Sequence, residues 1–314
     1  MTPLASAIAA MLAHRRPFFE TCTAFRLCHH ELGRGLTIDY YDGYLLLIYY
    51  ANFPEQKLAG LAHAVAEGLV AAALPVQGAL ARFRPDNLSH ATAEPDPAHP
   101  RATLLFGNAP PPRFTIREYD LQFVVSFEQG HSTGLFLDMK QARQELKQLL
   151  ARGAQVLNLF SYTGGFSIAA ARAGAGRVIE VDTSAKWLQW ARENQVLNQV
   201  SVVRQRREEA IRFLHKQKEG SFDVIICDPP TYATQKSGSR FTLEKGYASM
   251  IPEFFRVLRA GGHLLACTNY HGLSPAKFFR LFGEVFTLRR QISSSADFAG
   301  DDYLKVGWFQ AKRG

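Results

Sequence analysis

One stretch of the sequence, residues 156–167, constrains the fold more than any other. It reads Val-Leu-Asn-Leu-Phe-Ser-Tyr-Thr-Gly-Gly-Phe-Ser, a short apolar run followed by a glycine pair. The run predicts a buried strand, and the alanine-rich residues 168–173 predict a helix. Gly164 and Gly165 lack a Cβ, so the backbone can turn tightly there and come close to a ligand. A strand, a glycine turn and a helix form the phosphate- or nucleoside-binding start of a doubly wound sheet, although the motif GxGxxG is absent.

Two further apolar runs end in acidic residues. Residues 178–182 read Val-Ile-Glu-Val-Asp, and Asp182 follows the glycine turn at about the 20-residue distance of an acid that binds ribose hydroxyls. Residues 222–227 form another apolar run, which continues into Asp228-Pro229-Pro230. A proline pair cannot continue a strand ladder, so this strand must end there. Because ligands bind at the carboxyl ends of parallel strands, the glycine turn, Asp182 and Asp228 should face one crevice.

Strand and helix patterns alternate through the rest of this half. The predicted order is a helix at 184–198, a short strand at 200–203, a basic helix at 208–218, a helix at 240–258 that ends at Gly261-Gly262, a strand at 263–268, a helix at 274–282 and an antiparallel pair at 286–292 and 303–310. This order predicts an α/β fold: a doubly wound, mostly parallel sheet with an antiparallel C-terminal hairpin.

The first 112 residues have a different pattern, which predicts a small α+β domain. A helix is expected at 1–20, and two strand-like runs flank Asp42-Gly43, a strong hairpin signal. A helix at 58–74 and a strand near 78–84 complete this domain. Residues 85–112 are rich in proline and predict a linker. The expected domains are therefore 1–112, including the linker, and 113–314.

Composition limits the partners and the chemistry. The chain has 36 Lys and Arg against 28 Asp and Glu, a net charge of +8, which suits either a polyanionic partner or simple solubility. The four cysteines, at 22, 28, 227 and 267, form no CxxC pair and no metal-ligand cluster, so no metal is expected. Reduced thiols of this kind suit the cytoplasm. No apolar stretch is long enough to predict a membrane span.

Four motifs together resemble those of class I S-adenosylmethionine-dependent methyltransferases. The motifs are Thr133-Gly-Leu-Phe-Leu-Asp138, Asn158-Leu-Phe-Ser-Tyr-Thr-Gly-Gly165, Val181-Asp-Thr-Ser184 and Asp228-Pro-Pro-Thr-Tyr232. From about Phe114 onward the chain is similar to bacterial enzymes that methylate bases of 23S ribosomal RNA, namely the cytosine-C5 family and the guanine-N7 module of the fused large-subunit enzyme. The resemblance implies a Rossmann-like fold, S-adenosyl-L-methionine as cofactor, and ribosomal RNA (23S) or a large-subunit precursor as partner.

The resemblance also implies which residues hold the cofactor. Asp182 would accept the ribose hydroxyls, although a residue just ahead of a helix can instead be its N-cap. Glu209 would receive the adenine amino group, although it can also be a solvated helix position among arginines. The full implied set is Thr133, Phe136, Asp138, Asn158, Phe160, Tyr162, Thr163, Gly164, Gly165, Asp182, Thr183, Glu209 and Asp228.

The residues expected to position the target base are Asp228, Pro229, Pro230, Tyr232 and Asn269. In the related exocyclic-amine enzymes an aromatic residue follows the proline pair at once, whereas Thr231 intervenes here. Cytosine C5 requires a cysteine that adds to C6. When this sequence is compared with the cytosine-C5 family it resembles, Asn269 occupies the position of that cysteine, and Cys267 comes two residues earlier.

Guanine N7 is therefore the favoured target atom. Asn269 and the segment Asp297-Phe298-Ala299 match the guanine-N7 module. Because N7 carries a lone pair, catalysis needs mainly proximity and orientation and no general base. Three alternatives stay open: a cytosine-C5 enzyme with Cys267 or Cys227 as nucleophile, a non-catalytic RNA-binding protein on the same fold, and a dehydrogenase, which the absence of GxGxxG disfavours.

Overall fold

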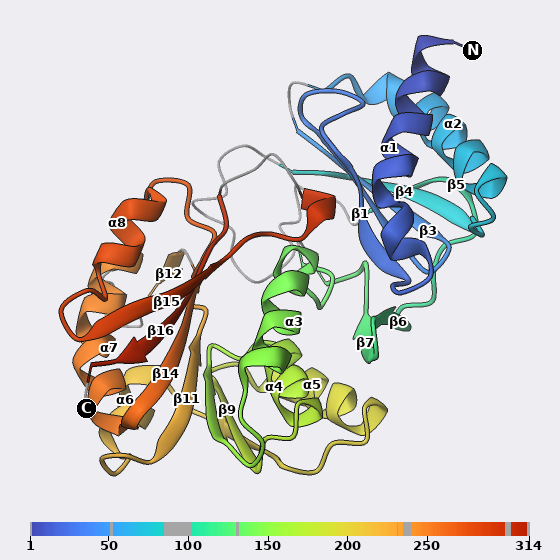
Figure 1. Cartoon of the computed structure of the whole chain (residues 1–314). Helices are drawn as coiled ribbons and strands as arrows, with labels where there is room; N and C mark the ends of the chain where they lie inside the picture. The colour runs from blue at the N-terminus through green and yellow to red at the C-terminus, as the bar shows by residue number, and fades with distance from the viewer. Residues whose placement is uncertain are drawn as a thin grey trace. The chain divides into compact units, whose positions relative to one another are not determined.

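The computed structural model describes residues 2–50, 53–84, 102–129, 132–230, 232–234, 240–298 and 303–312. The chain forms two compact units (Figure 1). The N-terminal unit consists of Met1–Asp138 and Ser295–Ala299, and the C-terminal unit consists of Met139–Ser294 and Gly300–Gly314. Most of the predicted linker, residues 85–101, lies outside the described residues. The sequence placed the domain boundary at residue 112, whereas residues 113–138 group with the N-terminal unit.

The N-terminal unit contains a five-stranded sheet in the order β1-β2-β3-β4-β5. Its elements are α1 (Pro3–Phe19), β1 (Ala24–His29), β2 (Leu36–Tyr41), β3 (Tyr44–Tyr49), the 3₁₀ turn η1 (Glu55–Lys57), α2 (Leu58–Ala71), β4 (Gly78–Phe83), β5 (Thr103–Gly107), and a separate hairpin of β6 (Phe114–Glu118) and β7 (Leu121–Val125). The predicted β2–β3 hairpin is confirmed. Asp42 and Gly43 both have positive φ, 45° and 94°, as a type I′ turn requires.

Helices α1 and α2 cover one face of this sheet. Apolar residues of α1, such as Met11, and of α2, such as Leu69, pack with Phe25 and Leu47 of the strands. Each of these four side chains is at least 98% buried, and burying a side chain of this size stabilises the fold by about 1.5–3 kcal/mol.

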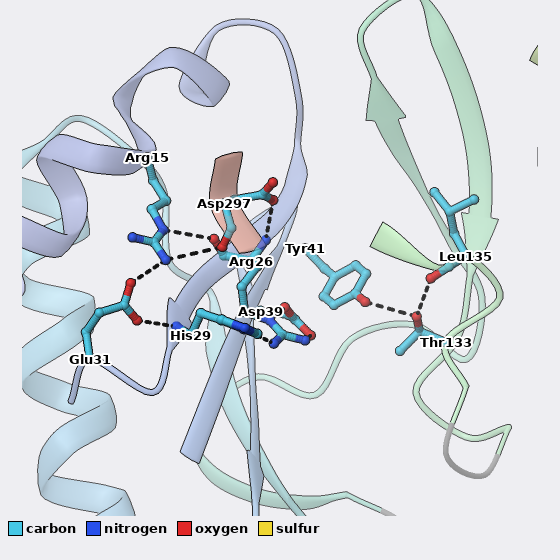
Figure 2. A network of polar contacts seen from close by, with 9 residues as sticks. All are labelled: Arg15, Arg26, His29, Glu31, Asp39, Tyr41, Thr133, Leu135 and Asp297. Atoms are coloured by element: carbon cyan, nitrogen blue, oxygen red, sulfur yellow. Dashed lines mark hydrogen bonds and ion pairs between the residues drawn. The ribbon is translucent and has the colours of Figure 1, made fainter. Parts of the chain in front are cut away.

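The segment Ser295–Ala299 completes the N-terminal unit, although it comes from the other end of the sequence. Its 3₁₀ turn is η4 (Ala296–Phe298). Asp297 is fully buried: its Oδ2 accepts the Arg26 N–H at 2.9 Å, and its carbonyl oxygen accepts from Nη2 of Arg15 at 3.2 Å (Figure 2). The Arg26 guanidinium lies 4.5 Å from the ring centroid of Phe298. Part of this segment resembles the guanine-N7 module in sequence. In the structure the segment packs into the N-terminal unit and helps to hold it together.

The C-terminal unit contains a seven-stranded sheet in the order β10-β9-β8-β11-β14-β16-β15. Its strands are β8 (Gln155–Leu159), β9 (Arg177–Asp182), β10 (Val203–Arg207), β11 (Phe222–Cys227), β14 (Leu258–Thr268), β15 (Phe286–Ile292) and β16 (Lys305–Ala311). The first five strands in this order are parallel, and β16 is antiparallel to both of its neighbours. The predicted doubly wound sheet with an antiparallel C-terminal hairpin is confirmed. The strand order reverses beside β8, where such sheets bind ligands.

Helices cover both faces of this sheet (Figure 1). The helices are α3 (Lys140–Leu149), which follows the turn η3 (Leu137–Met139), and α4 (Gly165–Arg172), α5 (Ala185–Leu197), α6 (Ala210–His215), α7 (Leu243–Val257) and α8 (Pro275–Arg280). Alternate side chains of β8 separate the two faces. Leu157 joins the core formed with α6, α7 and α8, whereas Asn158 points to α4. No helix among the described residues is long and apolar enough to span a membrane.

Several predicted boundaries are wrong because strand pairing outweighs local preference. Arg204–Arg207 extend β10 in parallel register with β9, from Val203 opposite Val178 to Arg207 opposite Asp182, and the basic helix shrinks to α6. An edge strand tolerates such arginines, since their side chains stay in water while the backbone pairs. Gly261-Gly262 does not end a helix. It forms an irregularity inside β14, where Phe222 pairs with Leu258 but Val224 pairs with His263.

Candidate active site

The glycine turn after β8 has a backbone that few residues adopt. Phe160, Tyr162 and Gly164 all have positive φ, at 56°, 50° and 82°. Such conformations in non-glycine residues store strain and cluster at functional sites. A Cβ on Gly164 would lie 3.0 Å from Oε2 of Glu180 and 3.1 Å from the Cβ of Ala191. This position therefore requires glycine for both conformation and space, as the sequence predicts.

Asp182 lies at the carboxyl end of β9, and both of its carboxylate oxygens accept backbone N–H groups. Oδ2 accepts from Tyr162 at 3.0 Å and Oδ1 accepts from Ser184 at 2.9 Å. Burial raises the pKa of Asp182, and these backbone hydrogen bonds oppose the shift. The N-cap of α5 is Ser184, whose hydroxyl accepts from the Trp187 N–H at 3.3 Å. The N-cap alternative for Asp182 is therefore wrong, and its carboxylate is oriented at the sheet edge.

Two buried asparagine side chains hold the glycine turn and the helix that follows it through hydrogen bonds. Asn158 is 2% exposed, and its Nδ2 donates to the Ser167 hydroxyl at 2.9 Å, which joins β8 to α4. Asn194 of α5 is fully buried and donates from Nδ2 to the carbonyl oxygen of Thr163 at 2.9 Å. Sequence reasoning missed Asn194. The available signal was a polar residue on the helix stripe that includes Ala191.

A buried acid, Glu180, lies beneath the turn and was also missed. Its Oε1 accepts from the side-chain amides of Gln195 at 2.7 Å and Gln205 at 2.8 Å. Burial raises the pKa of Glu180. The acid and the two amides link β9, α5 and β10, so they fix the strands whose ends carry the candidate site.

The expected adenine side is more exposed. Glu209 is the N-cap residue of α6, and its carboxylate forms an ion pair with Arg212 at 3.1 Å; the Glu209 side chain is 43% exposed. Thr183 is exposed and its carbonyl oxygen accepts from Nε of Arg207. The Tyr162 and Trp187 rings meet edge to face, with centroids 4.7 Å apart.

Parallel strand ends bring the candidate base-positioning residues to this same edge. Asp228 follows β11 and is half-buried, Pro229 is buried and Pro230 is exposed. Asn269 follows β14, the neighbour of β11, and is also exposed. Tyr232 lies on the short strand β12 (Tyr232–Thr234), which pairs with β13 (Arg240–Thr242), but its side chain and all of Thr231 lie outside the described part of the structure.

Side chains of two neighbouring strands hold the backbone of the loop that carries Asn269. Thr268 is buried and its hydroxyl accepts the Tyr270 N–H at 3.1 Å. Lys305, opposite Thr268 on β16, donates from Nζ to the carbonyl oxygens of Tyr270 at 2.8 Å and Tyr303 at 2.7 Å. The loop backbone is thereby fixed while the Asn269 side chain remains at the surface.

The two core cysteines near this edge are inaccessible. Cys227 and Cys267 are fully buried, and the Tyr247 hydroxyl lies 2.9 and 2.8 Å from their carbonyl oxygens. Burial raises the pKa of Cys227. A cysteine nucleophile must be exposed and readily ionised, so this environment opposes nucleophilic catalysis.

The segment with Thr133, Phe136 and Asp138 belongs to the N-terminal unit. Thr133 and Asp138 are buried, whereas Phe136 is 45% exposed. Among the residues that the structure describes, no group of three or more histidine, cysteine, aspartate or glutamate side chains could hold a metal ion. The C-terminal unit thus presents an oriented carboxylate and a tight glycine turn at the carboxyl ends of its parallel strands.

Comparison with known proteins agrees with this geometry. A family model described as S-adenosylmethionine-dependent methyltransferase matches residues 18–285. YwbD of Bacillus subtilis, a candidate ribosomal RNA large subunit methyltransferase, is 30% identical over 324 aligned residues, covering 95% of this chain and 78% of YwbD. Ribosomal RNA large subunit methyltransferase K/L of Alcanivorax borkumensis is 37% identical over 157 residues, which are 49% of this chain and 22% of the relative. Methyltransferase I of Erwinia tasmaniensis is 37% identical over 166 residues, covering 52% of this chain and 41% of the relative.

Solved structures give the same result. SMU.776, a candidate methyltransferase in complex with SAH, superposes with a TM-score of 0.84 at 25% identity, covering 98% of this chain and 81% of that one. The M. jannaschii tRNA m1G37 methyltransferase shares the fold alone, with a TM-score of 0.60 at 11% identity over 99% of this chain and 79% of that one. The chain therefore belongs to the S-adenosylmethionine-dependent methyltransferase family and uses S-adenosyl-L-methionine as its cofactor.

Proposed function

We propose that this enzyme methylates a base of 23S ribosomal RNA, with guanine N7 as the target atom. The relatives named for ribosomal RNA large subunit methylation support the substrate class. The net charge of +8 suits an RNA partner. Arg204, Arg206 and Arg207 are exposed along the edge strand β10, and their hydrogen bonds go to backbone carbonyl oxygens, which leaves positive charge at the surface.

The cofactor side follows from the strand ends. Asp182 would accept the two ribose hydroxyls, and Glu209 would receive the adenine amino group. The turn from Phe160 to Gly165, with Thr183 beside Asp182, would enclose the rest of the molecule, while Asn158 supports the turn. When bound, S-adenosylmethionine supplies an electrophilic methyl group on a sulfonium sulfur, and the protein contributes binding and orientation.

The base side is built for positioning. Asp228, Pro229, Pro230, Tyr232 and Asn269 would hold an unpaired or flipped guanine, since a stacked base is hard to reach. Guanine N7 has a lone pair in the ring plane and needs no deprotonation. Proximity and orientation therefore supply the catalysis, and we assign no general base.

The burial of both cysteines is the observation that carries the choice of atom. Methylation of cytosine C5 requires a thiolate that adds to C6. Cys227 and Cys267 are fully buried in adjacent strands, and Asn269 is exposed at the strand end instead. Four free thiols also suit the cytoplasm, where we place the enzyme.

Nucleoside mass spectrometry tests the proposal. The protein is incubated with labelled S-adenosylmethionine and unmodified 23S ribosomal RNA, free or in large-subunit particles, and the digest is analysed. We expect the label in 7-methylguanosine, at the same level in a Cys267→Ser variant. Label in 5-methylcytidine that disappears in this variant would overturn guanine N7. Absence of label from both RNA and particles, with cofactor binding retained, would overturn the ribosomal RNA substrate.

A further inference from the structure

Tyr247 contacts the two strand ends that lead to Asp228 and Asn269. It belongs to α7 and is fully buried in the core of the C-terminal unit. Its hydroxyl lies 2.9 Å from the carbonyl oxygen of Cys227 and 2.8 Å from the carbonyl oxygen of Cys267. Cys227 is the last residue of β11, and Cys267 is the penultimate residue of β14. One hydroxyl therefore bridges two neighbouring parallel strands at their carboxyl ends.

The bridge lies where the ladder between β11 and β14 stops. The last paired residues of the two strands are Cys227 and Ala266. Beyond this pair, β11 continues into Asp228 and a proline pair, and prolines have no N–H to donate to a neighbouring strand. The ladder cannot hold the two strand ends together past this point. The Tyr247 hydroxyl supplies a contact to both of them there.

Aromatic side chains hold the ring of Tyr247 in place. Phe278 of α8 and Phe282, which follows α8, meet it edge to face, with ring centroids 5.7 and 5.2 Å away. Both phenylalanines are fully buried. Burial raises the pKa of Tyr247, so the hydroxyl keeps its single proton, which the two carbonyl oxygens share. The fixed ring thereby places a permanent donor between the strand ends.

We propose that Tyr247 is a positioning residue for the target base. Asp228 directly follows Cys227, and Asn269 comes two residues after Cys267. By holding both carbonyl oxygens, Tyr247 sets the distance between the strand ends and thereby the spacing of the Asp228 and Asn269 side chains. Because Tyr247 is fully buried, it acts through the backbone and does not touch the base. The inference rests on the proposed function, to which the roles of Asp228 and Asn269 belong.

Amide hydrogen exchange of the free, full-length protein tests the bridge without any substrate. Tyr247→Phe removes the hydroxyl and keeps the ring. Peptides that cover residues 266–272 should exchange about 3- to 10-fold faster than in the wild type, which is the loss expected for one buried hydrogen bond. Peptides that cover residues 178–184, at the end of β9, should exchange as in the wild type. Wild-type exchange at 266–272 in this variant would overturn the inference.

Steady-state kinetics with ribosomal RNA test the consequence for the reaction. Tyr247→Phe should lower kcat about 3- to 10-fold, because misplaced base contacts act on the transition state, while the KM for RNA and the Kd for S-adenosylmethionine stay at wild-type values. Combined with Asn269→Ala, the loss should be smaller than the product of the two single losses, because both changes act on one contact. A wild-type kcat, independent losses in the double variant, or an equal loss of cofactor affinity would each overturn the inference.

Tyr40→Phe is the matched control. Tyr40 is a tyrosine of β2 that is 2% exposed, and its hydroxyl donates to the carbonyl oxygen of Pro75 at 3.0 Å. Its ring also packs against an aromatic ring, that of Phe25, with centroids 5.2 Å apart. Tyr40→Phe should lower the melting temperature as Tyr247→Phe does, but leave kcat and the exchange at 266–272 unchanged.

Equal effects of the two variants on kcat would reduce Tyr247 to a purely structural role and overturn the inference. If the wild type fails to label ribosomal RNA while Tyr247→Phe speeds exchange as expected, the proposed substrate alone is overturned, because exchange is measured without RNA.

Discussion

The ends of β9 and β14 lie at the same edge of one sheet, yet they are built differently. At the end of β9, Asp182 is half-buried and each of its oxygens accepts a backbone N–H. At the end of β14, Asn269 is exposed, and Thr268 and Lys305 fix the backbone that follows it. The first end is oriented before any ligand arrives, whereas the second presents a side chain to solvent.

This difference suits two kinds of ligand. A small cofactor that is the same in every turnover gains affinity from a site that is already oriented. A large substrate brings its own contacts, so the protein can leave the corresponding side chains exposed. Changes at β9 should therefore act on cofactor affinity, and changes at β14 should act on turnover of the RNA substrate.

Asp182→Ala should produce the largest effect. It removes the proposed ribose acceptor and leaves the Tyr162 and Ser184 N–H groups without their partner, so affinity for S-adenosylmethionine should fall on the order of 100-fold. Calorimetric titration measures this loss. Asp223→Ala is the control, because Asp223 also accepts a backbone N–H, from Gln155 at 2.7 Å, but at the amino end of β11. The contrast between strand ends breaks down if Asp223→Ala weakens cofactor binding as much.

Gly164→Ala should act on the same side through the backbone. The residue has φ of 82°, and the new Cβ would lie 3.0 Å from Oε2 of Glu180. We expect a loss of roughly 1–2 kcal/mol of folding free energy from the left-handed conformation, plus weaker cofactor binding. Chemical denaturation measures the folding free energy, and calorimetric titration measures the affinity for the cofactor. Gly153→Ala isolates the conformational part, since Gly153 has φ of 79° with no atom within 4 Å of the added Cβ. Equal cofactor affinities for both variants would contradict a specific role for Gly164.

Cofactor affinity should also depend on pH through Asp182. Its folded-state pKa is raised by burial, so the carboxylate takes up a proton at a higher pH than an ordinary aspartate. The proposed contact with the ribose hydroxyls uses the ionised form, so affinity should fall by up to about tenfold per pH unit below that pKa. In the free protein the sign is opposite: the raised pKa favours folding at low pH, and that contribution is lost as the pH rises through the folded value.

Titrations across the acid range check this dependence. Asp182→Asn should flatten the profile at a reduced affinity. Burial raises the pKa of the neighbouring Glu180 too, so Glu180→Gln serves as the comparison and should keep the Asp182-dependent decline. If only Glu180→Gln flattened the pH profile of cofactor affinity, the pH dependence would belong to Glu180 and not to Asp182.

Asn269→Ala should have the smallest effect and should act on the other side of the contrast. Loss of the polar contact to the base that we propose for Asn269 predicts about a 3- to 10-fold decrease in kcat/KM for RNA. The Kd for S-adenosylmethionine should not change, because the loop backbone is held by Thr268 and Lys305. Steady-state kinetics and titration of the same preparation separate the two. An equal loss of affinity for S-adenosylmethionine in Asn269→Ala would mean that the ends of β9 and β14 act as one site, against the predicted contrast.

Local signals predicted several structural features correctly. The glycine turn, the acid at the end of β9, the Asp42-Gly43 hairpin and the Ser184 cap each depend on residues close together in sequence. Their physical requirements, a left-handed φ or a cap for a free N–H, act within one turn of chain. These features could therefore be predicted without knowledge of the packing.

The sequence by itself determined the alternation of the main strands and helices of the C-terminal unit, the glycine turn and the acids at the strand ends. Only the tertiary structure decided that Arg204–Arg207 form a strand, that Asn194 and Glu180 support the turn, and that Asp297 bonds with Arg26, 271 positions away in sequence. The burial of Cys227 and Cys267 was likewise decided only by the tertiary structure. The reason is physical: parallel pairing and buried polar contacts join residues far apart in the chain, and no local pattern specifies which partner will lie opposite.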